Sequence, residues 1–305
     1  MNTCVIGGTG HIGRNLVPML LDEGWPVTVI TSGRTPVPSG GKWSRVTFVR
    51  CRYGDAGWAE CLQQQRPEVL IDILGTDAPA TYQAVKSTCR HFILCGSIWM
   101  FGEPRVVPTP DDTQNPCLFD GYARRYEQMR ELKKTTAADG LAFSAVMPPN
   151  ICGPGKIPLD GLGGRSIELH KAHQRGDPVP LPAPGSTLIS PCDAFDVAQG
   201  FFLAARQRDA AADQIFNVGA DYALTVRQFI ETYGEIYGVK IPIDWCSWQR
   251  YSEEVSPDPC AHFHFRAHMC PDLAKIKTCL GYGPRYTCEQ SMERAVAWMR
   301  EQEMI

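Results

Sequence analysis

The sequence predicts an α/β protein built around a parallel β-sheet. In its first third, short apolar runs typical of strands alternate with segments that have the apolar spacing of helices. The apolar runs are nearly continuous, as in Val69-Leu70-Ile71, which is typical of strands buried on both faces. A glycine-rich turn, Gly7-Gly8-Thr9-Gly10-His11-Ile12-Gly13, joins the first run to the first helical segment.

The elements expected up to residue 147 follow this alternation. The first helix has Ile12, Leu16 and Leu20 on one face and ends at Gly24. We expect strands over 3–6, 27–30, 47–50, 69–74, 92–95 and 142–147, and helices over 12–23, 60–65, 82–90 and 122–138.

The composition and the pattern of predicted elements change after residue 150. Glycine and proline cluster over 153–164 and 177–185, and the alternation fades. A helix over 197–206 and a strand over 214–218 are expected to return to the main sheet, followed by a helix over 226–237. We therefore predict a first domain over 1–155, with later returns near 187–220, and a smaller lobe formed mainly by 156–305.

Composition and charge exclude several classes of protein. The 30 basic and 33 acidic residues give a net charge of −3, without the basic excess that nucleic-acid binding by bulk charge requires. No apolar run approaches the ~18 residues of a membrane span, and the N-terminus does not resemble a signal peptide. The 13 cysteines show no Cys-x-x-Cys spacing, which favours reduced thiols and a cytoplasmic location.

The glycine turn predicts a dinucleotide site. Its spacing, Gly7-x-x-Gly10-x-x-Gly13, lies between a strand and a helix, which is the context of a Rossmann fold. Gly7 permits the tight turn, Gly10 a close approach to pyrophosphate, and Gly13 helix–strand packing, while the helix N-terminus favours the anion. The alternative is a plain turn. The contacts expected are Gly7, Thr9, Gly10, His11, Ile12 and Gly13.

The end of the second predicted strand favours NADP over NAD. An acidic residue there would bond the ribose hydroxyls of NAD, but the sequence is Thr31-Ser32-Gly33-Arg34. Arg34, with Arg14 and Ser32, is expected to hold a 2′-phosphate; a solvated Arg34 is the competing interpretation. Asp55 is expected to accept a hydrogen bond from the adenine amine, unless it only shapes a turn.

Together, these segments resemble the extended or atypical short-chain dehydrogenase/reductases of the NAD-dependent epimerase/dehydratase group. The resemblance runs from Thr3 to about residue 300 and implies a Rossmann doubly wound parallel sheet with a smaller C-terminal substrate-binding lobe. Besides the glycine turn, it rests on Cys95-Gly96-Ser97, Phe101-Gly102, Met147-Pro148-Pro149-Asn150, Gly153-Pro154-Gly155, residues 193–198, Phe216-Asn217-Val218-Gly219, Leu224-Thr225-Val226 and Leu280-Gly281-Tyr282.

The resemblance implies a catalytic pair. Ser97 would hold a substrate oxygen, and Tyr122 would be the acid/base. The family's Tyr-x-x-x-Lys pair is incomplete here, because Tyr126 stands at the Lys position; it would contact the cofactor ribose or only pack. A Lys would lower the pKa of the catalytic Tyr. Arg125 is the only local candidate for this charge and Lys156 could approach from the loop after Asn150, but neither restores the family's arrangement. The alternatives are backbone bonding for Ser97 and an aromatic lining role for Tyr122.

Asn150 and the segment 260–270 are further implied to contact substrate. If that segment is extended, His262, His264 and His268 share one face, because strand side chains alternate. They would then hold an anionic or hydroxylated substrate, bind a transition metal, or form a loop of partly buried histidines. The segment lacks a four-ligand spacing, so no metal is expected.

Three functions remain open. The first is an NADP-dependent oxidoreductase or epimerase acting on a small sugar-like or carbonyl substrate, with Tyr122 moving the proton that matches the hydride. The second is a non-catalytic dinucleotide-binding sensor or scaffold, suggested by the missing Lys. The third is a metal-assisted lyase or isomerase that uses the histidines. The resemblance also implies a homodimer paired through the helix over 122–138.

Overall fold

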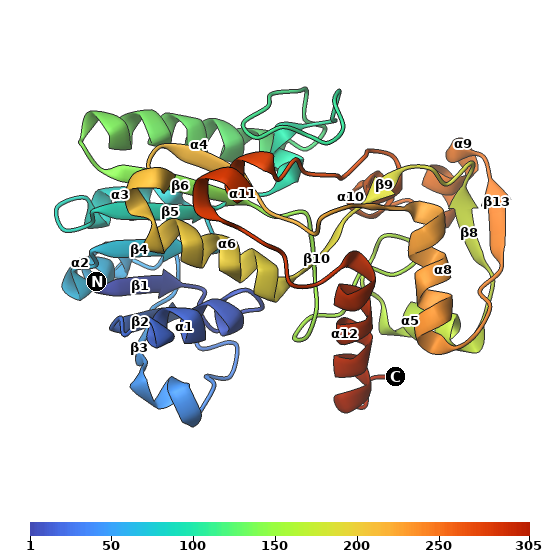
Figure 1. Cartoon of the computed structure of the whole chain (residues 1–305), viewed down its shortest axis with the longest axis horizontal. Coiled ribbons are helices and arrows are strands. Elements are labelled where there is room, and N and C mark those ends of the chain that lie inside the picture. The colour runs from blue at the N-terminus through green and yellow to red at the C-terminus, as the bar shows by residue number, and fades with distance from the viewer.

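The computed structural model describes residues 1–305 and contains a seven-stranded sheet in the order β11-β6-β5-β4-β1-β2-β3 (Figure 1). Every neighbouring pair is parallel. The order reverses between β1 and β4, which confirms the doubly wound sheet. The strands are β1 (Thr3–Ile6), β2 (Val27–Thr31), β3 (Thr47–Arg50), β4 (Val69–Asp72), β5 (His91–Cys95), β6 (Ala142–Met147) and β11 (Gln214–Asn217).

Helices cover both faces of this sheet, and each face has a core of 28 buried residues. On one face, α1 buries Leu16 and Leu20 beside α6, which buries Phe201. On the other face, α4 buries Met129 and Leu132. The first face carries α1 (Gly13–Asp22), α6 (Ala194–Arg206), α7 (Arg208–Ala211) and α11 (Ala274–Leu280), and the second carries α2 (Trp58–Gln65), α3 (Ala78–Val85) and α4 (Asp120–Ala138).

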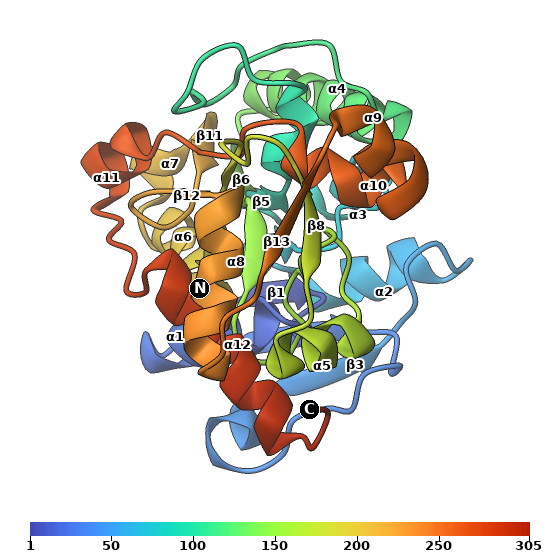
Figure 2. The same ribbon diagram turned by 90° about the vertical axis from the view of Figure 1, so that its right-hand side faces the viewer.

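A smaller lobe lies beyond the carboxyl ends of the strands and has a third core of 19 buried residues (Figures 1 and 2). Its strands form two-stranded pairs: β7 (Asn150–Cys152) with β10 (Pro191–Asp193), β9 (Leu188–Ile189) with β12 (Leu224–Thr225), and β8 (Val179–Pro182) with β13 (Ile243–Cys246). Its helices are α5 (Ile167–Arg175), α8 (Val226–Tyr237), α9 (Trp248–Arg250), α10 (Pro259–His262) and α12 (Cys288–Glu301).

Carboxylates at the start of α6 attach this lobe to the main sheet. Asp193 caps α6 by accepting a hydrogen bond from the Phe195 N–H at 2.8 Å, and it accepts a second from Arg294 of α12 at 2.9 Å. One turn later, Asp196 accepts from the backbone N–H groups of Arg285 and Tyr286. The segment 193–198, which was identified from the sequence only by its resemblance to a family motif, therefore joins α6 to α12 and to the loop before it.

Two sequence expectations need correction. The helix expected over 82–90 is α3, which begins earlier because the Asp77 side chain accepts a hydrogen bond from the Ala80 N–H. The segment 260–270 is not an extended strand. Asp258 caps α10 by accepting from the Cys260 N–H, Pro259 stands in its first turn, and a 3-10 turn over Phe263–Phe265 follows.

Two further observations concern the chain as a whole. None of the helices combines the length and the apolar composition that a membrane crossing requires. All 13 cysteines are free thiols.

The glycine turn has the local geometry that its spacing predicts. Gly7 has φ of 82°, in the left-handed region that disfavours side chains. A Cβ at Gly13 would lie 2.4 Å from the Gly8 Cα and carbonyl oxygen, so only glycine lets α1 start against the turn. This contact places the helix N-terminus at the crevice where the strand order reverses.

Gly13→Ala is expected to reduce the free energy of unfolding by at least about 2 kcal/mol, because backbone atoms of Gly8 would have to move. Urea denaturation measures this loss. Gly283→Ala is the control, since a Cβ there meets nothing within 4 Å. Equal stabilities for the two variants would contradict the packing role of Gly13.

Candidate active site

A cleft of about 330 Å³ opens at the carboxyl ends of β1, β2, β3 and β4. The glycine turn forms its floor, and Leu74, which is 48% exposed after β4, lies beside Gly7. This is the place where a doubly wound sheet binds a dinucleotide. The lining residues are Ile6, Gly7, Thr9, Gly10, Ile30, Thr31, Ser32, Arg34, Thr35, Cys51, Arg52, Tyr53, Trp58, Leu74 and Thr76.

One end of this cleft is basic and has no acidic lining residue. Arg34 and Ser32 line the cleft, as expected. Arg52, which was not predicted from the sequence, lines it too. Arg14 lies outside the lining; its Nε donates to the Thr9 carbonyl at 3.1 Å and its Nη2 to the Pro36 carbonyl at 3.4 Å. Arg14 therefore braces the turn.

The adenine end is also different from the expectation. Asp55 is exposed and does not line the cleft. The wall is instead formed by Tyr53 and Trp58, whose rings stack with centroids 4.4 Å apart. An aromatic wall of this kind suits the flat face of a base. The sequence gives one hint of it, because Tyr53 lies three residues after the end of the strand predicted over 47–50.

His11 connects the glycine turn to the second lobe. Its Nε2 lies 3.2 Å from the carbonyl oxygen of Gly153, in the loop after β7, so this nitrogen carries the proton and donates. Burial, with the charge of Lys156 as the next cause, lowers the pKa of His11 to about 4. The imidazole is therefore neutral at physiological pH, and the bond spans the two parts of the chain.

A second cleft of about 400 Å³ adjoins the first, and Leu74 lines both. It brings together Ser97, Tyr122, Asn150 and His264 from four separate segments of the chain. Its lining residues are Ile12, Ile73, Leu74, Cys95, Gly96, Ser97, Trp99, Tyr122, Arg125, Pro148, Pro149, Asn150, Ile151, Lys156, Leu159, Arg165, Cys260 and His264.

Ser97 and Tyr122 have free polar atoms in this cleft. Ser97 follows β5, and its Oγ accepts a hydrogen bond from the Trp99 N–H at 3.3 Å, which leaves the hydroxyl hydrogen to donate. Tyr122 lies in the first turn of α4. Burial raises the pKa of Tyr122, and the charge of Arg125 opposes that rise. Arg125 is held by donating from Nη2 to the Leu74 carbonyl at 3.2 Å.

Tyr126 lies in neither cleft, so the structure does not place it at a cofactor ribose. It is buried, its hydroxyl donates to Asp112 at 2.8 Å, and its ring packs edge-on against Phe101. The residue at the family's Lys position thus fixes the loop before α4. The physical reason is hydrophobic: a phenol at this position gains more from burial than from pointing into a polar cleft.

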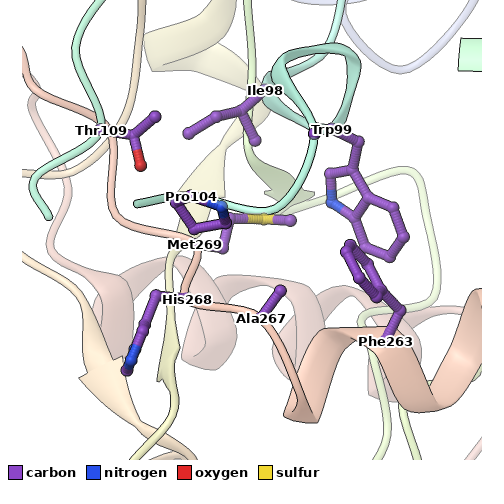
Figure 3. Close-up of a pocket in the computed structure, with 9 residues that line it drawn as sticks. Ile98, Trp99, Pro104, Thr109, Phe263, Ala267, His268 and Met269 are labelled. Carbon is purple, nitrogen blue, oxygen red and sulfur yellow. The ribbon is translucent and has the colours of Figure 1, made fainter. Parts of the chain in front are cut away.

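The side chains of the three histidines in the segment 260–270 point to different places. Only His264 reaches the cleft, with its ring edge-on to Trp99 at 4.5 Å. His262 donates from Nδ1 to the Ser256 carbonyl at 2.8 Å, and His268 accepts the Leu188 N–H at 3.1 Å. Figure 3 shows His268 directed away from the contact between Trp99 and Phe263. Residues of this region, His268 among them, line a gap of about 10 Å³. The three side chains would share one face only on an extended strand, and the helical turns of this segment preclude that conformation.

No group of three His, Cys, Asp or Glu side chains could hold a metal ion. The geometry therefore gives no support to a metal-assisted reaction at the histidines.

A family model described as the NAD dependent epimerase/dehydratase family matches residues 3–84 and 80–219. The chain belongs to this family. Among curated relatives, the UDP-glucose 4-epimerase of Corynebacterium glutamicum is 23% identical, over 94% of this chain and 92% of that protein. The chloroplast stem-loop binding protein of 41 kDa b of Arabidopsis thaliana is 22% identical, over 92% of this chain and 75% of that protein.

Solved structures share the fold. The UDP-glucose 4-epimerase of Thermotoga maritima with UDP-glucose has a TM-score of 0.77 and 20% identity, over 99% of this chain and 100% of that chain. The UDP-glucose-4-epimerase of Stenotrophomonas maltophila with bound NAD and formylated UDP-arabinopyranose also has a TM-score of 0.77, at 17% identity over 99% of both chains.

The buried His11 predicts a loss of stability in acid. Its folded pKa of about 4 lies below the ordinary value of 6.5, so the unfolded chain binds the proton more readily between these values. Its contribution is full above pH 6.5 and is lost as the pH falls through 4. Between pH 7 and pH 4, the wild type should lose on the order of 1–3 kcal/mol more than His11→Gln.

Urea unfolding across this pH range measures the difference, with the exposed His268→Gln as the control. Parallel pH profiles for the wild type and His11→Gln would contradict a buried, neutral His11.

Proposed function

We propose that the protein is an NADP-dependent oxidoreductase or epimerase that acts on a small sugar-like or carbonyl substrate. The observation that carries this proposal is the continuity of the two clefts. Leu74 lines both, the glycine turn contributes Gly7 and Gly10 to one and Ile12 to the other, and Ser97 and Tyr122 face the second. A dinucleotide laid along the turn would end beside the proposed catalytic pair.

The proposed chemistry assigns one task to each residue. A dinucleotide held at the glycine turn would supply the hydride acceptor for oxidation of a substrate carbon, or the hydride donor for its reduction. In the oxidising direction, Tyr122 Oη takes the proton of the hydroxyl on that carbon, and Ser97 donates a hydrogen bond to its oxygen. The buried Asn150 amide, which has no protein partner, would bond a second substrate oxygen. In reduction, Tyr122 returns the proton to the oxygen.

Arg125 takes the electrostatic role that a Lys has in the family's Tyr-x-x-x-Lys pair. It lies one helical turn after Tyr122, lines the same cleft, and lowers the pKa of the phenol against the effect of burial. Its charge is permanent, so it opposes the effect of burial at every pH, although the net shift keeps the pKa of Tyr122 above its ordinary value. The phenolate is the form that accepts a proton.

The cofactor preference rests on the basic end of the first cleft. Arg34 and Arg52 line it without any acidic residue to bond ribose hydroxyls. A 2′-phosphate would supply the anionic partner that the two guanidinium groups lack in the cleft. NAD, which the Stenotrophomonas relative holds, is the alternative.

The second candidate is a dinucleotide-binding sensor without catalysis. Tyr126 favours it, since the family's Lys position is occupied by a side chain buried against Asp112 and Phe101. The homodimer through α4 stays a prediction from the family resemblance.

Arg34→Ala is expected to weaken NADPH binding by about tenfold or more and to leave NADH affinity nearly unchanged, because only NADPH carries the 2′-phosphate. Calorimetric titration measures both constants. Lys42→Ala removes a surface charge outside the cleft, paired with Asp22 at the C-terminal end of α1, and is the control. An equal loss for both cofactors would contradict the 2′-phosphate assignment.

Tyr122→Phe is expected to reduce turnover by about 10²–10⁴ while NADPH affinity is retained, because the phenol supplies only the proton transfer. The assay follows NADPH absorbance with sugars and carbonyl compounds. Turnover unaffected by this substitution would reject Tyr122 as the acid/base, and tight NADPH binding without any turnover would favour the sensor.

Arg125→Gln tests the same assignment through pH. Loss of the cation raises the pKa of Tyr122, so the rising limb of the oxidation rate should move to higher pH, and Arg125→Lys should restore most of the shift.

A further inference from the structure

The second cleft has an unbalanced charge. Arg125, Lys156 and Arg165 line it, and its lining includes no Asp or Glu. None of the three forms an ion pair within 4.0 Å, although eleven such pairs occur elsewhere in the chain. The buried Asp160 accepts three backbone N–H groups, those of Leu162, Gly164 and Ser166. Asp160 acts on Arg165 electrostatically but forms no ion pair with any of the three cations. Cations whose charge is only partly offset are costly to bury unless an anion joins them.

Arg165 is held in a fixed position. Its Nη1 donates to the Ile157 carbonyl and its Nη2 to the Ile151 carbonyl, so it bridges both ends of the loop after β7. A guanidinium has about five N–H donors, so several remain for a ligand. Two carbonyls orient the group without cancelling its charge. This arrangement suits a planar oxyanion with two acceptor atoms.

Three further polar groups around Arg165 lack protein partners. Lys156 makes no ion pair or side-chain hydrogen bond, and partial burial, with the charge of Arg165 as the second cause, lowers its pKa to about 8. The buried Nδ1 of His264 has no partner, and the Asn150 amide nitrogen, in a residue only 7% exposed, has none either. All three residues line the cleft. Such atoms are normally satisfied, so a ligand is the missing partner.

We infer that Lys156 and Arg165 form a binding site for an oxyanion, a carboxylate or a phosphate, on the substrate itself. The inference rests on the proposed function, because Ser97 and Tyr122 define the reacting end of the same cleft. The substrate would therefore be a small hydroxy or carbonyl compound that carries a negative group. His264 and Asn150 would bond the neutral oxygens beside that group.

A phosphate of the cofactor is the competing occupant. Lys156 follows the loop whose Gly153 carbonyl bonds His11 of the glycine turn, so it lies near the path of the pyrophosphate. Saturation with cofactor separates the two possibilities, because a bound dinucleotide already fills its own phosphate sites.

The experiment titrates the NADPH-saturated protein with inorganic phosphate and, separately, with malonate, by calorimetry. One of the two probes should bind, and the stronger one identifies the anionic group. Lys156→Gln and Arg165→Lys should each weaken that binding, Lys156→Gln by about tenfold, since a charge-assisted hydrogen bond is lost. Lys171→Ala, which removes a half-exposed Lys paired with Glu168 outside the cleft, is the control and should leave binding unchanged.

Each outcome decides the inference. If NADPH binds but neither probe binds, the anion site is rejected and the proposed function stands. If Lys156→Gln and Arg165→Lys weaken NADPH and the probe by the same factor, the cations serve the cofactor and the inference is overturned. If Lys171→Ala weakens binding of the probe by the same factor, the loss reflects the net charge of the protein and not a specific site, and the inference is overturned. Failure of the wild-type protein to bind NADPH would reject the proposed function. That outcome is distinct from the others, because it is seen without any substitution.

Discussion

The contact between Gly13 and Gly8 is the constraint on which the rest of the site depends. Because no Cβ intervenes, α1 starts directly against the turn after β1, and its N-terminus faces the crevice at the point where the strand order reverses. His11 is thereby brought within 3.2 Å of the Gly153 carbonyl, which ties the second lobe to the turn. A looser start of α1 would separate the two clefts that share Leu74.

Charge in this protein is organised locally. The chain has a net charge of −3, yet neither cleft is lined by an acidic residue, and each is lined by at least two cations. Arg34 and Arg52 serve one end of the proposed cofactor path, and Arg125 serves the phenol of Tyr122. Anionic ligands that bind these cations would stabilise the folded protein by mass action. Binding and stability are thus coupled through the same side chains.

The sequence predicts the parallel sheet well, because strands buried on both faces have a continuous apolar pattern and the glycine spacing has a strict geometric cause. It predicts the second lobe poorly, since short paired strands such as β9 and β12 leave almost no pattern. His264 could not be distinguished from His262 and His268, because their divergence depends on helical turns set by the Asp258 cap. Arg52 and Arg165 were missed because only the tertiary fold brings them to a cleft.

The most direct test of the account is a crystal structure of the complex with NADPH. The account predicts the pyrophosphate at the glycine turn, the 2′-phosphate against Arg34 and Arg52, and the nicotinamide ring beside Leu74 between Ser97 and Tyr122. A dinucleotide whose nicotinamide lies outside the second cleft, or whose 2′-phosphate contacts neither Arg34 nor Arg52, would contradict it.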